Sequence, residues 1–143
     1  MKKNIFFLSL IVITIIAASC RDPKKARIED LIPPAYMNNP TTITFEDTTF
    51  DFGAVKQGEK AKHTFKFTNS GKNNLLIVNS FGTCGCTVPD YPKEPIKPGD
   101  GGVINVVFNS EGKEGEQHKK VIVIANTGKD KNVINFTAMV NKP

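Results

Sequence analysis

The sequence predicts an all-β domain built as a two-sheet sandwich, and three observations support this. Apolar and polar residues alternate with a period of two along most of the chain after residue 42, which is the pattern of half-buried strands. Clusters of Gly, Pro, Asn and Asp separate these runs, in a chain of 143 residues with 11 Gly and 9 Pro. No sustained apolar stripe with the 3.6-residue period of a helix appears among them. Many short strands with turns between them favour a sandwich.

The first 19 residues have the pattern of a bacterial lipoprotein signal peptide. Two lysines give a positive start, residues 5–16 form an apolar run, and small residues precede Cys20. An apolar run of about a dozen residues is too short for a membrane-spanning helix, which needs about 20. We therefore expect cleavage before Cys20 and a diacylglycerol, with chains such as palmitate, on its thiol. An ordinary secretory peptide cut after Ser19 and a short membrane anchor are the alternatives.

The expected lipid places the domain in the cell envelope, where thiols tend to be oxidised. Arg21, rather than an aspartate, follows the cysteine. By resemblance to enteric sorting rules this favours the outer membrane, with the domain facing the periplasm. Residues 20–41 are rich in Pro and Asn and have no sustained period, so we expect the lipidated cysteine to be followed by a flexible tether that spans roughly 25 Å. Within it, residues 27–32 are expected to form a helical turn at most.

The sandwich domain is expected over residues 42–143. The residues 69–74 and 126–130 are turn clusters, the second of them a hairpin connection. The continuous apolar run 121–124 predicts a central strand or a strand with a covered outer face. The total is about seven strands, as in immunoglobulin-like sandwiches. The expected strands lie around residues 43–45, 50–52, 63–68, 75–78, 103–108, 121–125 and 133–140.

The charge of the chain argues against a nucleic-acid partner. The formal net charge is +5, and about +3 once Lys2 and Lys3 leave with the signal peptide. The remaining lysines alternate with acidic residues, as in residues 113–120, and form no basic stripe with interleaved aromatics. The expected partners are therefore a membrane, through the N-terminal lipid, and a protein of the envelope.

The segment 82–89, Gly-Thr-Cys-Gly-Cys-Thr-Val-Pro, contains the residues best suited to redox chemistry or metal binding. Cys84 and Cys86 could form a disulfide around a permissive glycine, and such a small bridge would be easily reduced. Two thiolates could instead bind Cu(I), whereas zinc usually needs four ligands, and only His63 and His118 could complete them. A structural turn with small buried cysteines, or a static bridge, is the third interpretation and the one we favour. The sequence leaves the metal unknown, and we expect no cofactor.

The proline-rich residues 90–100 follow this pair. We expect them to form a connection that crosses between the sheets. In the alternative interpretation, Tyr91 and Ile96 form an exposed contact patch.

Several short motifs have ordinary explanations. His63 shares a face with Phe65, so we expect it to be packed rather than to bind a ligand, and His118 is expected in a solvated connection. The residues 51–53 spell Asp-Phe-Gly without the other kinase motifs. Thr48 lies in an Asp-Thr-Thr triplet that resembles a short bacterial O-glycosylation signal. No triad or carboxylate pair is apparent, so we expect no catalytic residues and no enzyme.

Four segments together resemble the domain of unknown function 1573 family, a group of bacterial exported proteins. They are Phe-Asp-Phe-Gly-Ala-Val at 50–55, Phe-Lys-Phe-Thr-Asn-Ser-Gly at 65–71, Cys-Gly-Cys-Thr-Val-Pro at 84–89 and Lys-Pro-Gly at 97–99. The resemblance covers residues 43–140 and implies an immunoglobulin-like sandwich, similar to domains of the Hydin and sperm-protein type. It implies no activity.

Related sandwiches mostly serve as binding or scaffold modules, and exposed strand edges permit strand addition by a partner peptide. We therefore expect a membrane-tethered, non-enzymatic binding or assembly module of the cell envelope. The alternative is a periplasmic Cu(I)-binding or thiol-redox protein that uses Cys84 and Cys86.

Overall fold

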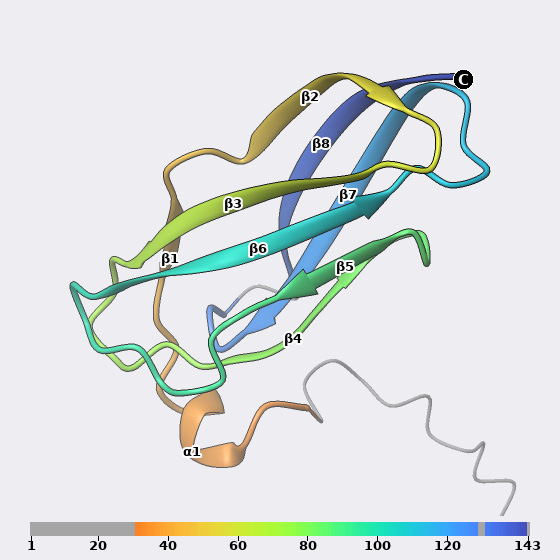
Figure 1. Cartoon of the computed structure of the whole chain (residues 1–143). Coiled ribbons are helices and arrows are strands. Elements are labelled where there is room, and N and C mark those ends of the chain that lie inside the picture. The colour runs from red at the N-terminus through yellow and green to blue at the C-terminus, as the bar shows by residue number, and fades with distance from the viewer. Residues whose placement is uncertain (1–30, 129–130, 143) are drawn as a thin grey trace, which may run out of the picture.

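The structure, a computed structural model, describes residues 31–128 and 131–142. The expected signal peptide, Cys20 and the first half of the expected tether lie outside the described residues. The described chain forms two four-stranded sheets packed face to face (Figure 1), which confirms the predicted all-β sandwich. No helix in this part of the chain is long and apolar enough to cross a membrane.

The described residues contain one helical turn and eight strands, against about seven expected. The additional strand is β5, which was not recognised in the sequence because Pro89 lies within it. An α-helical turn forms at residues 34–37, whereas most of the turn expected at 27–32 lies outside the described residues. In chain order the elements are α1 (Pro34–Met37), β1 (Ile43–Phe45), β2 (Thr49–Lys56), β3 (Lys60–Asn69), β4 (Ile77–Gly82), β5 (Thr87–Asp90), β6 (Gly101–Asn109), β7 (Gly115–Ala125) and β8 (Asn132–Asn141).

The first sheet has the strand order β1-β3-β6-β5 and the second the order β2-β8-β7-β4. Neighbouring strands are antiparallel except β2 and β8, which run parallel. The apolar run 121–124 lies in β7, between β8 and β4, and is thus the central strand that its composition predicted. The edges of the sandwich are formed by β1 and β5 in one sheet and by β2 and β4 in the other.

The core consists of the inward-facing residues of both sheets, as period-two alternation requires. His63 belongs to this layer, because its ring stacks on Phe50 with centroids 3.5 Å apart and planes 12° apart. Burial lowers the pKa of His63 from its ordinary value of 6.5, against an opposing effect of Asp47. The expectation of a packed histidine is thus confirmed. The largest fully buried side chains are Phe65, Phe67, Leu75, Ile104, Val106, Phe108, Val121, Val123, Ile124, Ile134, Phe136 and Val140.

The Asp-Phe-Gly triplet is explained by a bulge in β2. The pairing of β2 with β8 shifts register between Asp51 and Ala54, and Gly53 has a φ of 66°, which side chains rarely adopt. The carboxylate of Asp51 accepts hydrogen bonds from the Gly53 amide at 3.0 Å and the Thr137 hydroxyl at 2.8 Å. These two bonds lower the pKa of Asp51. The triplet therefore shapes an edge strand.

A buried asparagine, Asn69, fastens the loops at the end of the sandwich near α1. Its side chain accepts hydrogen bonds from the Thr41 hydroxyl at 2.7 Å and the Gly71 amide at 3.2 Å. It also donates to the carbonyl oxygens of Asn73 at 2.8 Å and Ile96 at 2.9 Å. The bonds to Thr41 and Ile96 join segments that are 28 and 27 residues apart along the chain. The bonds to Gly71 and Asn73 stabilise the turn that follows β3.

A second buried asparagine, Asn126, holds the segment before β1. Its side chain accepts from the Leu76 amide at 2.8 Å and donates to the carbonyl oxygens of Asn39 and Asn74. Its own carbonyl accepts from the Thr41 amide at 2.8 Å. The sequence predicts a tether up to residue 41 and a domain that begins at residue 42. In the structure, hydrogen bonds join the chain to the sandwich from Asn39 onward.

Candidate functional site

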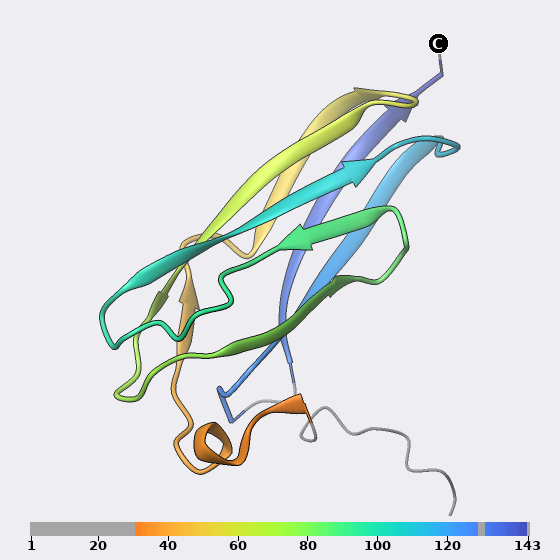
Figure 2. The same cartoon turned by 60° about the horizontal axis from the view of Figure 1, so that its bottom comes forward.

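The Cys-Gly-Cys turn joins the two sheets at their edges. The strand β4 is an edge of the second sheet and β5 an edge of the first, and the four residues between them, 83–86, make the crossing. Cys84 and Cys86 form a disulfide within this crossing, with Sγ atoms 2.12 Å and Cα atoms 5.3 Å apart. Of the interpretations that the sequence left open, the structure contains the oxidised pair, which a redox-active bridge and a static bridge both require. The turn lies at the end of the sandwich away from α1 (Figures 1 and 2).

Backbone hydrogen bonds fix the turn to both sheets. The Thr83 amide donates to the carbonyl oxygen of Lys120 in β7 at 3.0 Å. The carbonyl oxygen of Cys86 accepts from the amide of Asn109, at the end of β6, at 2.9 Å. The disulfide is therefore held in place by one hydrogen bond on each side of the sandwich.

The two residues that flank the turn explain most of its composition. A Cβ at Gly82 would lie 2.5 Å from the Cβ of Thr87, so the approach of β4 to β5 requires a glycine there. The buried Thr87 hydroxyl lies 3.7 Å from Sγ of Cys84 and 4.0 Å from Sγ of Cys86. Gly85, in contrast, is exposed and has open space where a side chain would point.

The two cysteines have different surroundings. The Cys86 side chain is half-buried and packs against the hydrophobic core, whereas Cys84 is not part of that packing. The turn therefore has an inner side fixed to the core and an outer side, at Gly85, that faces solvent.

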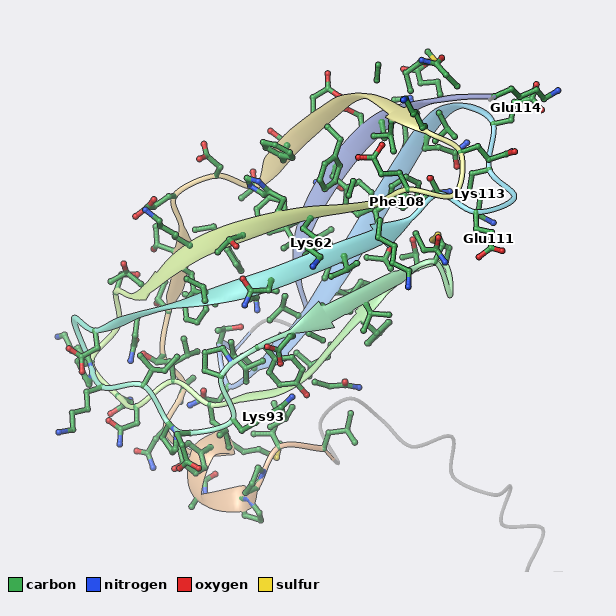
Figure 3. The ribbon with its side chains drawn as sticks, in the orientation of Figure 1. Lys62, Lys93, Phe108, Glu111, Lys113 and Glu114 are labelled. Atoms are coloured by element: carbon green, nitrogen blue, oxygen red, sulfur yellow. A yellow bond between two sulfur atoms is a disulfide. The ribbon has the colours of Figure 1, made fainter. Side chains whose placement is uncertain are left out.

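The neighbouring loops at this end are also fastened to one another. The buried Ser110 hydroxyl lies 2.8 Å from the carbonyl oxygens of both Lys56 and Glu59, and the Gln57 amide side chain donates to the carbonyl of Lys113 at 2.7 Å. Figure 3 shows Glu111, Lys113 and Glu114 at this end of the molecule. The disulfide thus lies on a rigid, polar end surface.

Tyr91 and Ile96 connect the loop after β5 to the residues of and before β4. The Tyr91 hydroxyl donates to the carbonyl oxygen of Val78 at 3.2 Å, and Ile96 exchanges two 2.8 Å backbone hydrogen bonds with Leu75. Both side chains are half-buried against the core. The ammonium group of Lys93, labelled in Figure 3, lies 3.1 Å from the centroid of the Tyr91 ring.

The expectation that residues 90–100 cross between the sheets is wrong. They connect β5 to β6, which are neighbours in the same sheet, and the crossing occurs at 83–86 instead. Pro89 concealed β5 in the sequence, so the crossing was assigned to the next loop. The half-buried packing of Tyr91 and Ile96 leaves little of either side chain for a contact patch.

The described residues bring no metal ligands together. They contain no group of three or more His, Cys, Asp and Glu residues that could hold an ion. His63 lies in its aromatic stack, and His118, expected in a solvated connection, lies in β7 with its exposed ring 3.0 Å from the carboxylate of Glu116. Neither histidine completes a site with the cysteine pair.

Thr48 lies between β1 and β2 and is exposed. It lines an open hollow of about 380 Å³, together with Ile43, Phe45 and Val133. Its backbone carbonyl accepts a hydrogen bond from the Asn135 amide at 2.8 Å. O-glycosylation of Thr48 stays a prediction.

Sequence comparisons identify one family. The model of the family described as "Protein of unknown function (DUF1573)" matches residues 43–140. No curated protein matches the chain.

Comparisons with solved structures show the fold. A protein of unknown function from Porphyromonas gingivalis W83 is 18% identical with a TM-score of 0.61, over 70% of this chain and 47% of that chain. The E. coli chaperone DraB is 9% identical with a TM-score of 0.50, over 70% and 56%. The VesB protease of Vibrio cholerae is 12% identical with a TM-score of 0.52, over 75% and 33%. This chain thus spans about half the length of the first structure and a third of the protease, and the predicted immunoglobulin-like sandwich is confirmed.

Proposed function

Since the chain belongs to the DUF1573 family, whose function is not known, we propose a role from its own geometry. It is a lipoprotein tethered to the outer membrane through Cys20 that faces the periplasm and acts as a non-enzymatic binding or assembly module. Its binding surface lies at the disulfide end of the sandwich.

The observation that carries this proposal is the separation of the two ends of the molecule. The chain enters the sandwich beside α1, where Asn126 holds Asn39. The Cys84–Cys86 turn lies at the other end (Figure 1). A lipid on Cys20 would therefore leave the disulfide end directed away from the membrane, where an envelope partner can reach it.

The fold supports a binding role over an enzymatic one. DraB, with which the chain shares its sandwich, is a chaperone, and the match to the VesB protease leaves two thirds of that protein uncovered. Loops fixed on a rigid sandwich are a common way of presenting binding residues.

Site-specific photo-crosslinking in intact cells tests the proposed surface. A photoreactive amino acid replaces Gly85, which is exposed and has open space around it, and the control places it at the exposed Asn74 near α1. We expect a discrete protein adduct from position 85 and a much weaker one from position 74. Equal adducts from both positions, or none from position 85, would contradict the proposal.

The proposed anchor has a separate test. Cys20→Ala should abolish labelling by a palmitate analogue and move the protein from the detergent phase to the aqueous phase in a phase-partition assay. Unchanged labelling in this variant would show that the lipid is attached to another residue and would contradict the proposed anchor.

A thiol-redox role is the second candidate, and the Cys84–Cys86 disulfide beside the Thr87 hydroxyl favours it. In this reaction a partner dithiol attacks one sulfur, the S–S bond breaks, and a mixed disulfide forms. The second partner thiolate then releases the protein, which leaves two cysteine thiols and an oxidised partner. The Thr87 hydroxyl is placed to donate a hydrogen bond to the departing thiolate. Cu(I) binding would need the same reduction first, because thiolates are the ligands.

Intact mass spectrometry after alkylation under denaturing conditions separates these roles. Protein equilibrated with a glutathione buffer should show two alkylated cysteines if the pair exchanges, and a mass lower by two hydrogens if the bridge is static. A copper-sized increment that is lost on denaturation would instead identify a metal carrier.

A further inference from the structure

We propose that β4 is an open edge to which an extended segment of another protein adds as a further strand, and that this segment alternates apolar residues with serine or threonine. This inference rests on the proposed binding role and gives it a surface, directly beside the disulfide turn.

The other three edge strands carry features that hinder strand addition. The strand β1 has three residues. The strand β2 is bent by the bulge at Gly53. The strand β5 includes Pro89, which has no amide hydrogen to donate. By elimination, β4 is the edge on which a regular partner strand can form.

The two halves of β4 differ. In the lower half, the carbonyl of Val78 already accepts a hydrogen bond from the Tyr91 hydroxyl, and the register shifts between Ile77 and Asn79. The upper half pairs regularly with β7 up to Gly82. Figure 2 shows β4 at the margin of its sheet. Strand addition is thus confined to the half next to the disulfide.

The direction of the free backbone groups follows from the pairing. The Thr83 amide donates to β7, so Phe81 also bonds toward β7 and the intervening Ser80 and Gly82 point their N–H and C=O groups outward. Among the described residues, no hydrogen bond between these outward groups and another backbone group is found outside the strand ladders. An antiparallel partner strand could therefore form up to four hydrogen bonds, two with each residue.

The outer face of this sheet indicates which side chains such a strand carries. Phe81 pairs with Ile122, and Ile122 pairs with Val133, so the three form one row across β4, β7 and β8. Phe81 is 41% exposed and Val133 is 37% exposed. An apolar residue of an added strand would continue this row and cover Phe81.

On the inner face of β4, an added strand should carry a small side chain with a hydroxyl group. The Ser80 side chain is only 8% exposed, and its hydroxyl has no hydrogen-bond partner in the part of the chain that the structure describes. A buried polar group without a partner is costly. Serine or threonine on the inner face of an added strand, opposite Ser80, would supply the missing partner, and Thr87 leaves little room for anything larger near Gly82.

The test uses a six-residue acetylated peptide that alternates valine and threonine, titrated into the ¹⁵N-labelled protein. Binding should slow hydrogen–deuterium exchange of the Ser80 and Gly82 amides, because they become donors to the peptide. A control peptide with proline in place of each threonine should not bind. Ser80→Ala should weaken binding about five-fold, the equivalent of one hydrogen bond.

Two further variants keep the test independent of folding. Ser80→Pro removes an outward amide without breaking a bond to β7, and Phe81→Lys places a charge on the open edge. Each should weaken binding about five-fold or more. Val88→Lys is the matched control, since Val88 is a more exposed apolar residue on the neighbouring edge strand β5, and binding should be unchanged.

The outcomes separate this proposal from the proposed function. Protection at Ser80 and Gly82, lost in Phe81→Lys and kept in Val88→Lys, supports strand addition at β4. Protection at another edge, or absence of peptide binding at millimolar concentration, overturns it. An adduct from position 85 in the crosslinking experiment would still stand in that case, and the binding module would use another surface.

Discussion

Replacing Asn69 by alanine should strongly destabilise the domain, although it removes no apolar contact of note. Its fully buried side chain makes four hydrogen bonds, to Thr41, Gly71, Asn73 and Ile96. At about 1 kcal/mol for each bond, the free energy of unfolding should fall by about 4 kcal/mol. This is a large fraction of the stability of a domain of this size. The melting temperature should fall by at least about 15 °C.

Thermal and urea unfolding, followed by circular dichroism, measure this loss. The matched control is Asn105→Ala, because Asn105 is exposed and its side chain accepts one hydrogen bond, from Thr64 at 2.8 Å. It should cost less than about 1 kcal/mol. If the two variants lose equal stability, the loops near α1 are not held by Asn69 and the reasoning is wrong.

Three further predictions concern the glycines, the disulfide and the histidine. Gly53→Ala should cost about 1–2 kcal/mol in urea unfolding because φ is 66°, whereas Gly85→Ala, which has open space and no positive φ, should cost almost nothing. Cys84→Ser combined with Cys86→Ser should cost about 1.5 kcal/mol, the loop-closure value for so short a ring, and a loss of folding would show a larger role. His63, whose pKa is lowered by burial, binds its proton more readily in the unfolded chain. The free energy of unfolding should therefore keep its full value above pH 6.5 and decrease as the pH falls below it. A series of unfolding curves at different pH values would check this, and His63→Phe should remove this part of the pH dependence.

The fold could be predicted because its signal is spread over many residues. The alternation of Phe65 and Phe67 with polar neighbours, and the continuous apolar run in β7, each depend only on which face is buried. The strand β5 was missed for a local reason. Pro89 normally argues against a strand, and only the tertiary structure places it at an edge where its missing amide costs nothing.

The site was only partly predictable. The cysteine pair could be found from its spacing, but its oxidised state and its place at the crossing between sheets depend on how β4 and β5 meet. The roles of Asn69 and Asn126 arise from contacts with segments up to 87 residues away along the chain. An asparagine in a Gly-rich turn is ordinary in sequence, and nothing there marks it as buried. The close approach of Gly82 to Thr87 could not be predicted either, because it depends on how β4 and β5 meet.

The central claim is that this protein binds a partner through its disulfide end without using the disulfide as a reagent. The most direct test repeats the photo-crosslinking from the exposed position 85 in the wild-type chain and in the Cys84→Ser, Cys86→Ser double variant. After the double variant has been shown to be folded, a binding module predicts the same adduct in both proteins. An adduct that appears only with the cysteines present, and that thiol reduction removes, would contradict the claim and establish thiol exchange instead.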